Sequence, residues 1–194
     1  MAAVAMQGNS TGKQRVLEAA HHLFAEGSYG SIGVAQIIER AGVQAPTLYH
    51  HFGDKEGLFV AWAEAAFEKV EDAVARVAQR NASTQDALCA YASAMLATLN
   101  FDVMQVLRDA PRLNKAENRD RVLSAYMRAV YEPLATLLVQ ATATQELRPE
   151  PLGQLTDVFL GGLLALRNSH VPVEAIAEKA AWWCDAFVRA FAAR

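Results

Sequence analysis

Apolar side chains recur at intervals of three and four along most of the chain, which is the spacing of amphipathic helices. The first such stripe holds Val16, Ala20 and Leu23. The helices that this spacing predicts cover about residues 11–26, 33–41, 47–52, 55–79, 84–99, 102–109, 115–144, 152–168 and 173–192. Pro133 should kink or divide the longest of the later helices, because proline removes a helical N–H donor. Alternation of strand period is never long enough to predict a sheet, so we expect an all-α fold.

The stretch 41–59, AGVQAPTLYHHFGDKEGLF, has the pattern of a helix-turn-helix. Gly42 supplies a tight turn, and Pro46 opens a short second helix in which Leu48 and Phe52 share an inward face. The side chains expected to face outward are Thr47, Tyr49 and His50. Hydroxyl and imidazole groups on such a helix suit phosphate oxygens and base edges in the major groove.

Over about residues 13–60, this pattern resembles the DNA-binding domain of the TetR family of bacterial transcriptional repressors. The resemblance implies that side chains at the positions of Thr47, Tyr49, His50 and Lys55 contact DNA. Lys55 also stands at the first turn of the following helix, where its charge and free N–H groups favour phosphate. Three further candidates at the start of the recognition helix are Gln44, Ala45 and Pro46. We expect the Gln44 amide to read a base and the Pro46 ring to touch a thymine methyl.

Two positions depart from the family pattern near helix starts. Ile32 stands where the family usually has a capping threonine, so Ser31 or Gly33 should cap the second helix less well. Gln44 replaces a serine that commonly caps the recognition helix.

The composition indicates the broad class of protein but points to no catalytic or metal site. Of 194 residues, 53% are hydrophobic and 20% are charged, which is typical of a soluble helical protein. The chain shows neither an apolar run long enough for a membrane span nor a signal sequence, so we expect a cytoplasmic protein. Cys89 and Cys184 are expected to be buried or half-buried thiols.

The net charge of −3 is unusual for a DNA-binding protein. Lysine and arginine balance aspartate and glutamate between residues 1 and 55, with four of each sign. We therefore expect modest non-specific DNA affinity and a shallow salt dependence.

Other chemistry is weakly indicated. The pairs His21–His22 and His50–His51 are adjacent, and neighbours on a helix do not face one metal ion. The sequence has no nucleophile elbow or phosphate-binding loop. We expect no catalytic residue, no metal and no cofactor.

The resemblance divides the chain into a disordered tail (1–10), a DNA-binding domain (11–55) and a helical ligand-binding and dimerisation domain (56–194). We expect a homodimer, because two recognition helices read two half-sites. The interface candidates, from the last two helices, are Phe159, Gly162, Leu163, Leu166, Trp183, Phe187 and Phe191. Candidates for an adaptable ligand pocket are Tyr91, Met95, Asn100, Phe101, Met104, Leu107, Arg108, Tyr126, Met127 and Tyr131. Each of these residues also suits ordinary helical core.

The expected function is a ligand-responsive transcriptional regulator, most simply a repressor that a hydrophobic or amphipathic inducer releases from a palindromic operator. Two alternatives remain: an activator of the same fold, or a helical small-molecule enzyme or carrier with a vestigial helix-turn-helix. For the switch, we expect a hinge at residues 80–84. The helix from Lys55 to about Gln79 should then be the sole covalent path from pocket to DNA.

Overall fold

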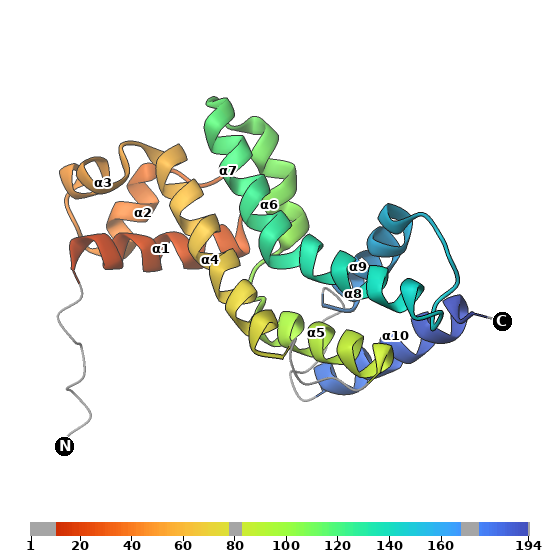
Figure 1. The fold of residues 1–194 in the computed structure, drawn as a ribbon. Coiled ribbons are helices and arrows are strands. Elements are labelled where there is room, and N and C mark those ends of the chain that lie inside the picture. Colours follow the sequence, from red (N-terminus) through yellow and green to blue (C-terminus); the bar gives the residue numbers. More distant parts are fainter. Residues whose placement is uncertain (1–10, 78–82, 168–174, 194) are drawn as a thin grey trace, which may run out of the picture. The chain divides into compact units, whose positions relative to one another are not determined.

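A computed structural model describes residues 11–77, 83–167 and 175–193, and its fold is all-α, as predicted (Figure 1). The packing of the chain separates two compact units. Residues 1–64 and 104–122 make up unit 1, and residues 65–103 and 123–194 make up unit 2. The predicted functional division after residue 55 stays a prediction.

Unit 1 contains the helix-turn-helix. Its elements are α1 (Gly12–Glu26), α2 (Val34–Ala41), α3 (Ala45–Phe52), the first part of α4 (Lys55–Val77), most of α6 (Val103–Asp109), η1 (Ala110–Arg112) and the first part of α7 (Ala116–Tyr126). Its core includes Val16, Phe24, Ile37, Leu48 and Phe59, which are all at most 3% exposed.

The helix boundaries in unit 1 follow from local chemistry. Thr11 caps α1: its side chain accepts a hydrogen bond from the Gln14 amide, while the Gln14 side chain accepts one from the Thr11 amide. Gly33 is the N-cap residue of α2 and offers no side-chain acceptor, but its own N–H donates to the Gln36 side chain at 2.7 Å. The weaker capping expected there stays a prediction. Gly42 ends α2 at φ +60°, in the left-handed region where glycine carries no steric cost.

Unit 2 holds the remaining helices. They are the second part of α4, α5 (Thr84–Thr98), the end of α7, the π-helical turn η2 (Met127–Tyr131), α8 (Glu132–Ala143), α9 (Leu152–Arg167) and α10 (Ile176–Phe191). Helices α5, α8, α9 and α10 pack on one another around Tyr91, Met95 and Phe159, which are at most 1% exposed.

Pro133 divides the long predicted helix, as expected. It lies in the first turn of α8, directly after η2. Proline has no N–H to donate within a helix, and its ring would clash with the carbonyl of the preceding turn. The wider π-helical turn leaves room for the ring and does not need the missing hydrogen bond. The buried Tyr91 hydroxyl donates to the Val130 carbonyl of η2 at 2.8 Å, which satisfies a carbonyl in this irregular turn.

Because unit 1 includes residues 104–122, the chain passes between the units at three places. Along the chain, α4 is still the only covalent connection from α3 to the residues of unit 2. The packing of residues 104–122 with the helix-turn-helix was not predicted, because helix spacing along the chain does not reveal which helices pack together. The predicted hinge at residues 80–84 lies largely outside the described residues, which resume at Ser83.

The two cysteines are placed as predicted. Cys89 is a half-buried free thiol and Cys184 a buried one. Burial, followed by a hydrogen bond with Cys89, raises the pKa of Cys184, so the two thiols are neighbours.

Within the described ranges, no single helix has the length and hydropathy of a membrane span. Helix α5 taken together with residues 103–112, a pair bent by 72°, has the length and composition of one.

Candidate nucleic-acid interface and ligand cavity

The recognition helix α3 is held by its ends and by one buried side chain. Gln44 is its N-cap, and Pro46 occupies the first turn, where a missing N–H has no cost. Gly53 ends the helix at φ +77° and donates its N–H to the Tyr49 carbonyl at 2.9 Å. Leu48 is fully buried, and this fixes which face of α3 points outward.

The outward face of α3 carries the predicted DNA-contacting groups. Pro46, Tyr49 and His50 are exposed and have the spacing of one helical face. Tyr49 is 50% exposed, although a tyrosine ring is usually covered. Gln44 precedes this face, and its side chain is exposed. Gln44 is the N-cap residue of α3, but its side chain makes no capping hydrogen bond. The structure thus brings these four side chains to one exposed end of unit 1.

Ala45 and Thr47 are placed differently, because both are only half exposed. Thr47 packs on the start of α1: a Cβ atom added at Gly12 would lie 2.8 Å from the Thr47 methyl group. Gly12 therefore allows the first turn of α1 to approach the recognition helix closely. Arg15 reinforces this contact by donating to the Gly42 carbonyl at 3.2 Å.

Lys55 is turned inward. Its Nζ donates to the carbonyls of Tyr29 and Ile32, each at 2.8 Å, and lies 4.2 Å from the centre of the Tyr29 ring. Burial lowers the pKa of Lys55, and the negative charge of Asp109 opposes that effect. Two of the three N–H groups of Lys55 donate to carbonyls of the α1–α2 loop. We therefore assign Lys55 the role of positioning this loop rather than of binding a DNA phosphate.

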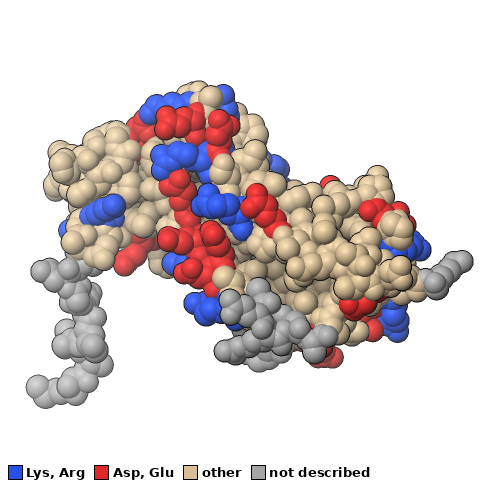
Figure 2. All heavy atoms as spheres, viewed as in Figure 1, with Lys and Arg blue, Asp and Glu red and all other residues tan. Residues whose placement is uncertain are grey.

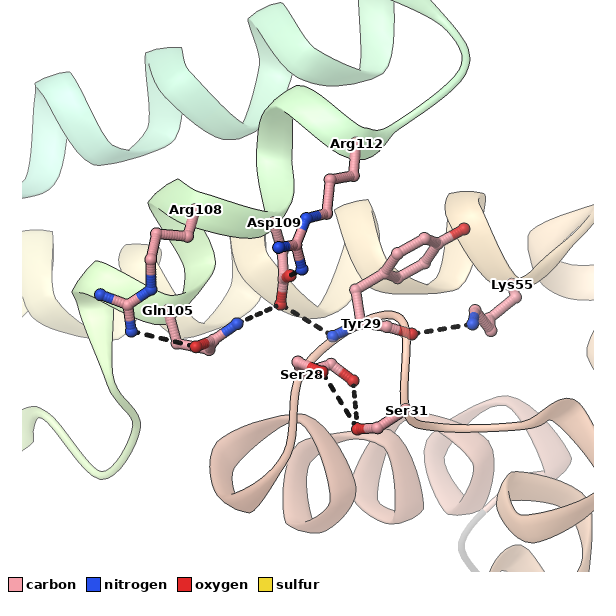
Figure 3. Close-up of polar contacts among 8 residues, drawn as sticks. All are labelled: Ser28, Tyr29, Ser31, Lys55, Gln105, Arg108, Asp109 and Arg112. Atoms are coloured by element: carbon pink, nitrogen blue, oxygen red, sulfur yellow. Dashed lines mark hydrogen bonds and ion pairs between the residues drawn. The ribbon is translucent and has the colours of Figure 1, made fainter.

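Sequence reasoning did not identify the buried carboxylate Asp109, which is 1% exposed. Figure 3 shows it between α6 and the α1–α2 loop: Oδ2 accepts from the Tyr29 amide at 2.7 Å and from Gln105 at 3.0 Å. Oδ1 pairs with Arg112 at 3.0 Å. The backbone of Tyr29 is therefore held at two points: Asp109 accepts from its N–H, and Lys55 donates to its carbonyl. The sequence around Asp109 gives no sign of its contact with Tyr29, because the two residues are 80 positions apart.

A second buried carboxylate, Glu56, begins α4. It accepts hydrogen bonds from the amide and side chain of Asn114, from the Lys115 amide and from the Asn118 side chain, at 2.8–3.1 Å. Burial opposes its ionisation, but these hydrogen bonds prevail and lower the pKa of Glu56 to about 2. An ionised Glu56 thus caps the N-terminus of α7 from another helix.

The charged side chains on the face drawn in Figure 2 are of both signs. On the face drawn in Figure 2, lysine and arginine side chains lie among aspartate and glutamate side chains rather than forming a continuous basic surface. This agrees with the formal neutrality of residues 1–55.

Unit 2 contains a cavity of about 220 Å³ between α4, α5 and α8. Its lining residues are Val74, Val77, Ala87, Tyr91, Pro133, Thr136, Leu137 and Gln140. The lining is mainly apolar, with the Thr136 and Gln140 side chains as polar groups. Such a cavity suits a small, largely apolar molecule.

Of the predicted pocket residues, only Tyr91 lines this cavity. Met95 and Phe101 are core residues, at most 5% exposed, and Phe101 packs edge-on against Phe67. Tyr126 packs on the same Phe67 ring. Met127 and Tyr131 lie in η2, and Asn100 is exposed between α5 and α6.

Three other predicted pocket residues belong to unit 1 and do not line the cavity. They are Met104, Leu107 and Arg108. Arg108 donates to Gln105 beside Asp109 (Figure 3). No pattern along the chain marked the other lining residues, since a cavity is the space that packed helices leave.

Several predicted interface residues are core residues of the chain itself. Phe159, Leu163 and Phe187 are at most 2% exposed, so they have almost no surface to offer a partner. Gly162 is covered by Trp183, which would collide with any Cβ atom there. Trp183 also donates to the Phe159 carbonyl at 3.1 Å, while Leu166 and Phe191 are half-buried. The periodicity located the apolar faces correctly but could not tell core from interface.

No group of three or more potential metal ligands is found among the described residues.

Comparison with known proteins agrees with the geometry of unit 1. Residues 16–62 match the family model for bacterial regulatory proteins of the tetR family. The chain is similar to the HTH-type transcriptional repressor AcnR of Corynebacterium glutamicum, with 37% identity over 62 residues, covering 32% of this chain and 33% of AcnR. It is also similar to the regulatory protein RaaS of Mycobacterium tuberculosis, with 36% identity over 74 residues, covering 38% and 34%. The aligned part thus spans about a third of these relatives.

Solved structures share the fold over nearly the whole chain. The TetR family regulator PfmR of Thermus thermophilus has a TM-score of 0.74 at 24% identity, covering 90% of this chain and 97% of PfmR. FadR of Bacillus subtilis, solved with stearoyl-CoA, has a TM-score of 0.69 at 15% identity, covering 91% and 96%.

Proposed function

We propose that this chain is a member of the TetR family of bacterial regulatory proteins, that it represses transcription from a palindromic operator, and that it releases the operator when a small apolar molecule fills the unit 2 cavity. The observation that carries the proposal is the outward face of α3. Tyr49 and His50 are exposed there, beside the buried Leu48 that fixes the helix. A tyrosine hydroxyl and an imidazole held out by a rigid short helix match the groups that read DNA.

Within this proposal the exposed side chains have distinct roles. Tyr49 donates to a phosphate and sets the register of the helix on the duplex. His50 and Gln44 reach base edges, and the Pro46 ring meets a thymine methyl. Since the surface has no continuous basic patch on the face drawn in Figure 2, affinity should depend on this geometry more than on net charge.

Dimerisation completes the operator-binding form. Along α9, Val158, Gly161 and Ala165 are exposed at spacings of three and four, and they form a small-residue stripe. On α10, Trp182 is 59% exposed, which is unusual for tryptophan. We assign these four residues, rather than the buried aromatic residues, to the contact with a second copy.

The ligand is expected to be smaller than a nucleotide and more apolar than a nucleotide or a sugar. The cavity has about 220 Å³ and only a few polar groups at its wall. The Tyr91 hydroxyl is already bonded to Val130, so Gln140 is the better group to orient a polar end of the ligand.

The test is to select duplexes from a random pool with the full chain and sequence those that are retained. The proposal expects an inverted repeat with half-sites about 34–36 Å apart or a multiple of that distance. The His50→Ala variant should recover the same repeat with a relaxed preference at one or two positions in each half-site. Retention without any shared sequence would count against the proposal. A reporter carrying the selected duplex in its promoter then distinguishes repression from activation.

A further inference from the structure

The two cysteines of the chain meet inside unit 2, although they lie far apart in the sequence. Cys89 lies on α5 and Cys184 on α10, and these two helices pack against each other (Figure 1). The two thiols are hydrogen-bonded to each other, and both are free rather than joined. The sequence contains no further cysteine, so each thiol has the other as its single possible partner within the chain.

Aromatic side chains next to the cysteines hold α5 and α10 together. Tyr91, two residues after Cys89, packs on Phe159 of α9 with 6.2 Å between the ring centres. Phe187, three residues after Cys184, packs edge-on against the same Phe159 ring at 5.0 Å. One buried ring therefore joins both helices beside the cysteines, and the hydrophobic core sets how near the two thiols lie.

Small side chains allow the two backbones to approach each other closely. Ala92 follows Cys89 by three positions and Ala180 precedes Cys184 by four, so each alanine shares a helical face with its cysteine. Both alanines are completely buried. A disulfide needs the Cα atoms of its cysteines about 4.4–6.8 Å apart, and larger side chains at these two positions would keep the helices further apart.

The two thiols differ in their access to solvent. Cys89 is half-buried, whereas Cys184 is fully buried. Burial, followed by the hydrogen bond with Cys89, raises the pKa of Cys184, so this side chain stays a thiol at neutral pH. An oxidant from solvent therefore reacts with Cys89 first. An accessible cysteine beside a second thiol is the arrangement in which a first oxidation ends in a disulfide.

We propose that Cys89 and Cys184 are a redox-active pair, which a hydroperoxide converts into a disulfide between α5 and α10. The Cys89 thiolate attacks one oxygen of the peroxide, and the O–O bond breaks. Cys89 is oxidised to a sulfenic acid, while the other oxygen takes up the proton released by the thiol and leaves as water or an alcohol. The Cys184 sulfur then attacks the Cys89 sulfur: the S–S bond forms, the S–O bond breaks, and the Cys184 proton leaves with the hydroxyl as water.

Contact between the two thiols makes the second step possible. A protonated thiol such as Cys184 is a weak nucleophile, but its sulfur already lies against that of Cys89, so the step is intramolecular. In a reducing compartment such a disulfide is transient, as is typical of redox-responsive proteins. The reaction involves neither the recognition helix nor the ligand cavity, so it is tested apart from the proposed function.

The experiment treats the reduced full-length chain with hydrogen peroxide, alkylates the remaining thiols under denaturing conditions, and measures the intact mass without reductant. Wild type should lose the mass of two hydrogen atoms, resist alkylation and migrate as a monomer in a non-reducing gel. Trypsin should then release the peptide 81–108 linked to the peptide 180–189. Dithiothreitol should restore both thiols to alkylation.

Two single variants test the order of the steps. In Cys184→Ser, the sulfenic acid at Cys89 should take up about tenfold more of a cyclic diketone probe than in wild type, because no neighbouring thiol removes it. In Cys89→Ser, Cys184 should remain a free thiol under the same treatment. If Cys184→Ser does not fold, Cys184→Ala provides the same comparison, and circular dichroism verifies the fold of each variant.

The matched control moves the accessible thiol by one residue, in a chain that combines Cys89→Ala with Ala90→Cys. Ala90 is half-buried like Cys89, but its side chain points about 100° further around α5. This chain should be oxidised at position 90 without forming a disulfide with Cys184.

Several outcomes would overturn the proposal. In wild type they are two thiols that both stay free, oxygen added to Cys89 without a link, or two chains joined through Cys89. A disulfide that forms equally well from position 90 would also overturn it, since the contact between Cys89 and Cys184 would then not direct the reaction. The linked peptides in a monomer of wild type, absent from the control chain, are the result that supports it.

Discussion

Replacing Glu56 by glutamine should destabilise the folded chain strongly at neutral pH and much less in acid. The substitution keeps the size of the side chain but removes its charge and turns one oxygen acceptor into a donor. Four hydrogen-bond donors then face a group that can satisfy only some of them. Two of those donors are backbone amides at the N-terminus of α7, where a negative charge is also favourable.

The size of this effect follows from the ionisation of Glu56. Folding lowers its pKa from 4.5 to about 2, and at 1.36 kcal/mol per pKa unit this difference is worth about 3 kcal/mol at pH 7. The folded pKa is the lower one, so the contribution is fully present above pH 4.5 and is lost as the pH falls toward 2. At about pH 3 only about 1 kcal/mol should remain.

The assay is chemical unfolding of wild type and Glu56→Gln at about pH 7 and about pH 3, at fixed protein concentration. The difference between the two chains should be about 3 kcal/mol at the higher pH and about 1 kcal/mol at the lower one. Glu64→Gln is the control, since its ion pair with Arg121 is exposed and should contribute under about 1 kcal/mol. A Glu56→Gln effect that is small, or equal at the two pH values, would refute the assignment of Glu56 as an ionised cap.

Three further predictions concern the interface, the loop and the dimer. Tyr49→Phe should weaken binding to selected and scrambled duplexes alike by about 1 kcal/mol in fluorescence anisotropy, and a loss confined to the selected duplex would show that Tyr49 reads a base instead. Lys55→Met should lower the free energy of unfolding by about 2 kcal/mol while leaving the salt dependence of DNA binding unchanged, and a salt slope reduced by about one would restore its role as a phosphate ligand. Val158→Glu should give a folded monomer in light scattering, as should Trp182→Glu, whereas dimers of both variants would place the interface elsewhere.

The helix-turn-helix could be predicted from sequence because its determinants are local. Gly42 marks the turn, Pro46 marks the first turn of α3, and Leu48 marks its buried face. Each signal acts within a few residues, so reading along the chain is enough to place the helix and the outward side chains of Tyr49 and His50. It did not reveal that Thr47 packs on the start of α1.

The attachments of Glu56 and Asp109 could not be predicted in this way. Glu56 meets partners 58 to 62 positions away, and Asp109 meets Tyr29 across 80 positions. A carboxylate at the start of a helix suggests an ordinary capping charge, and helix spacing does not tell which distant N–H it will meet. The inward turn of Lys55 was missed for the same reason, since its carbonyl partners lie in a loop before α2.

In unit 2, periodicity predicted the helices but not what covers their apolar faces. Phe159 and Phe187 were expected at an interface, yet they pack edge-on against each other inside the chain. Trp182 is exposed, whereas the next residue, Trp183, is half-buried and donates to the Phe159 carbonyl, and the two tryptophans differ only in their position around the helix. The sequence gives the angle between two side chains around a helix, but it does not tell which side of the helix faces the core.

Sequence-specific recognition by α3 is tested most directly by the affinity of the full wild-type chain for its selected duplex relative to a scrambled duplex of equal length, measured at one physiological salt concentration. A regulator that reads bases through α3 should prefer the selected duplex by about a thousandfold or more. The preference should collapse in the Gln44→Ala and His50→Ala double variant while the affinity for the scrambled duplex stays the same. Equal affinity of the wild-type chain for the two duplexes would show that α3 does not read sequence.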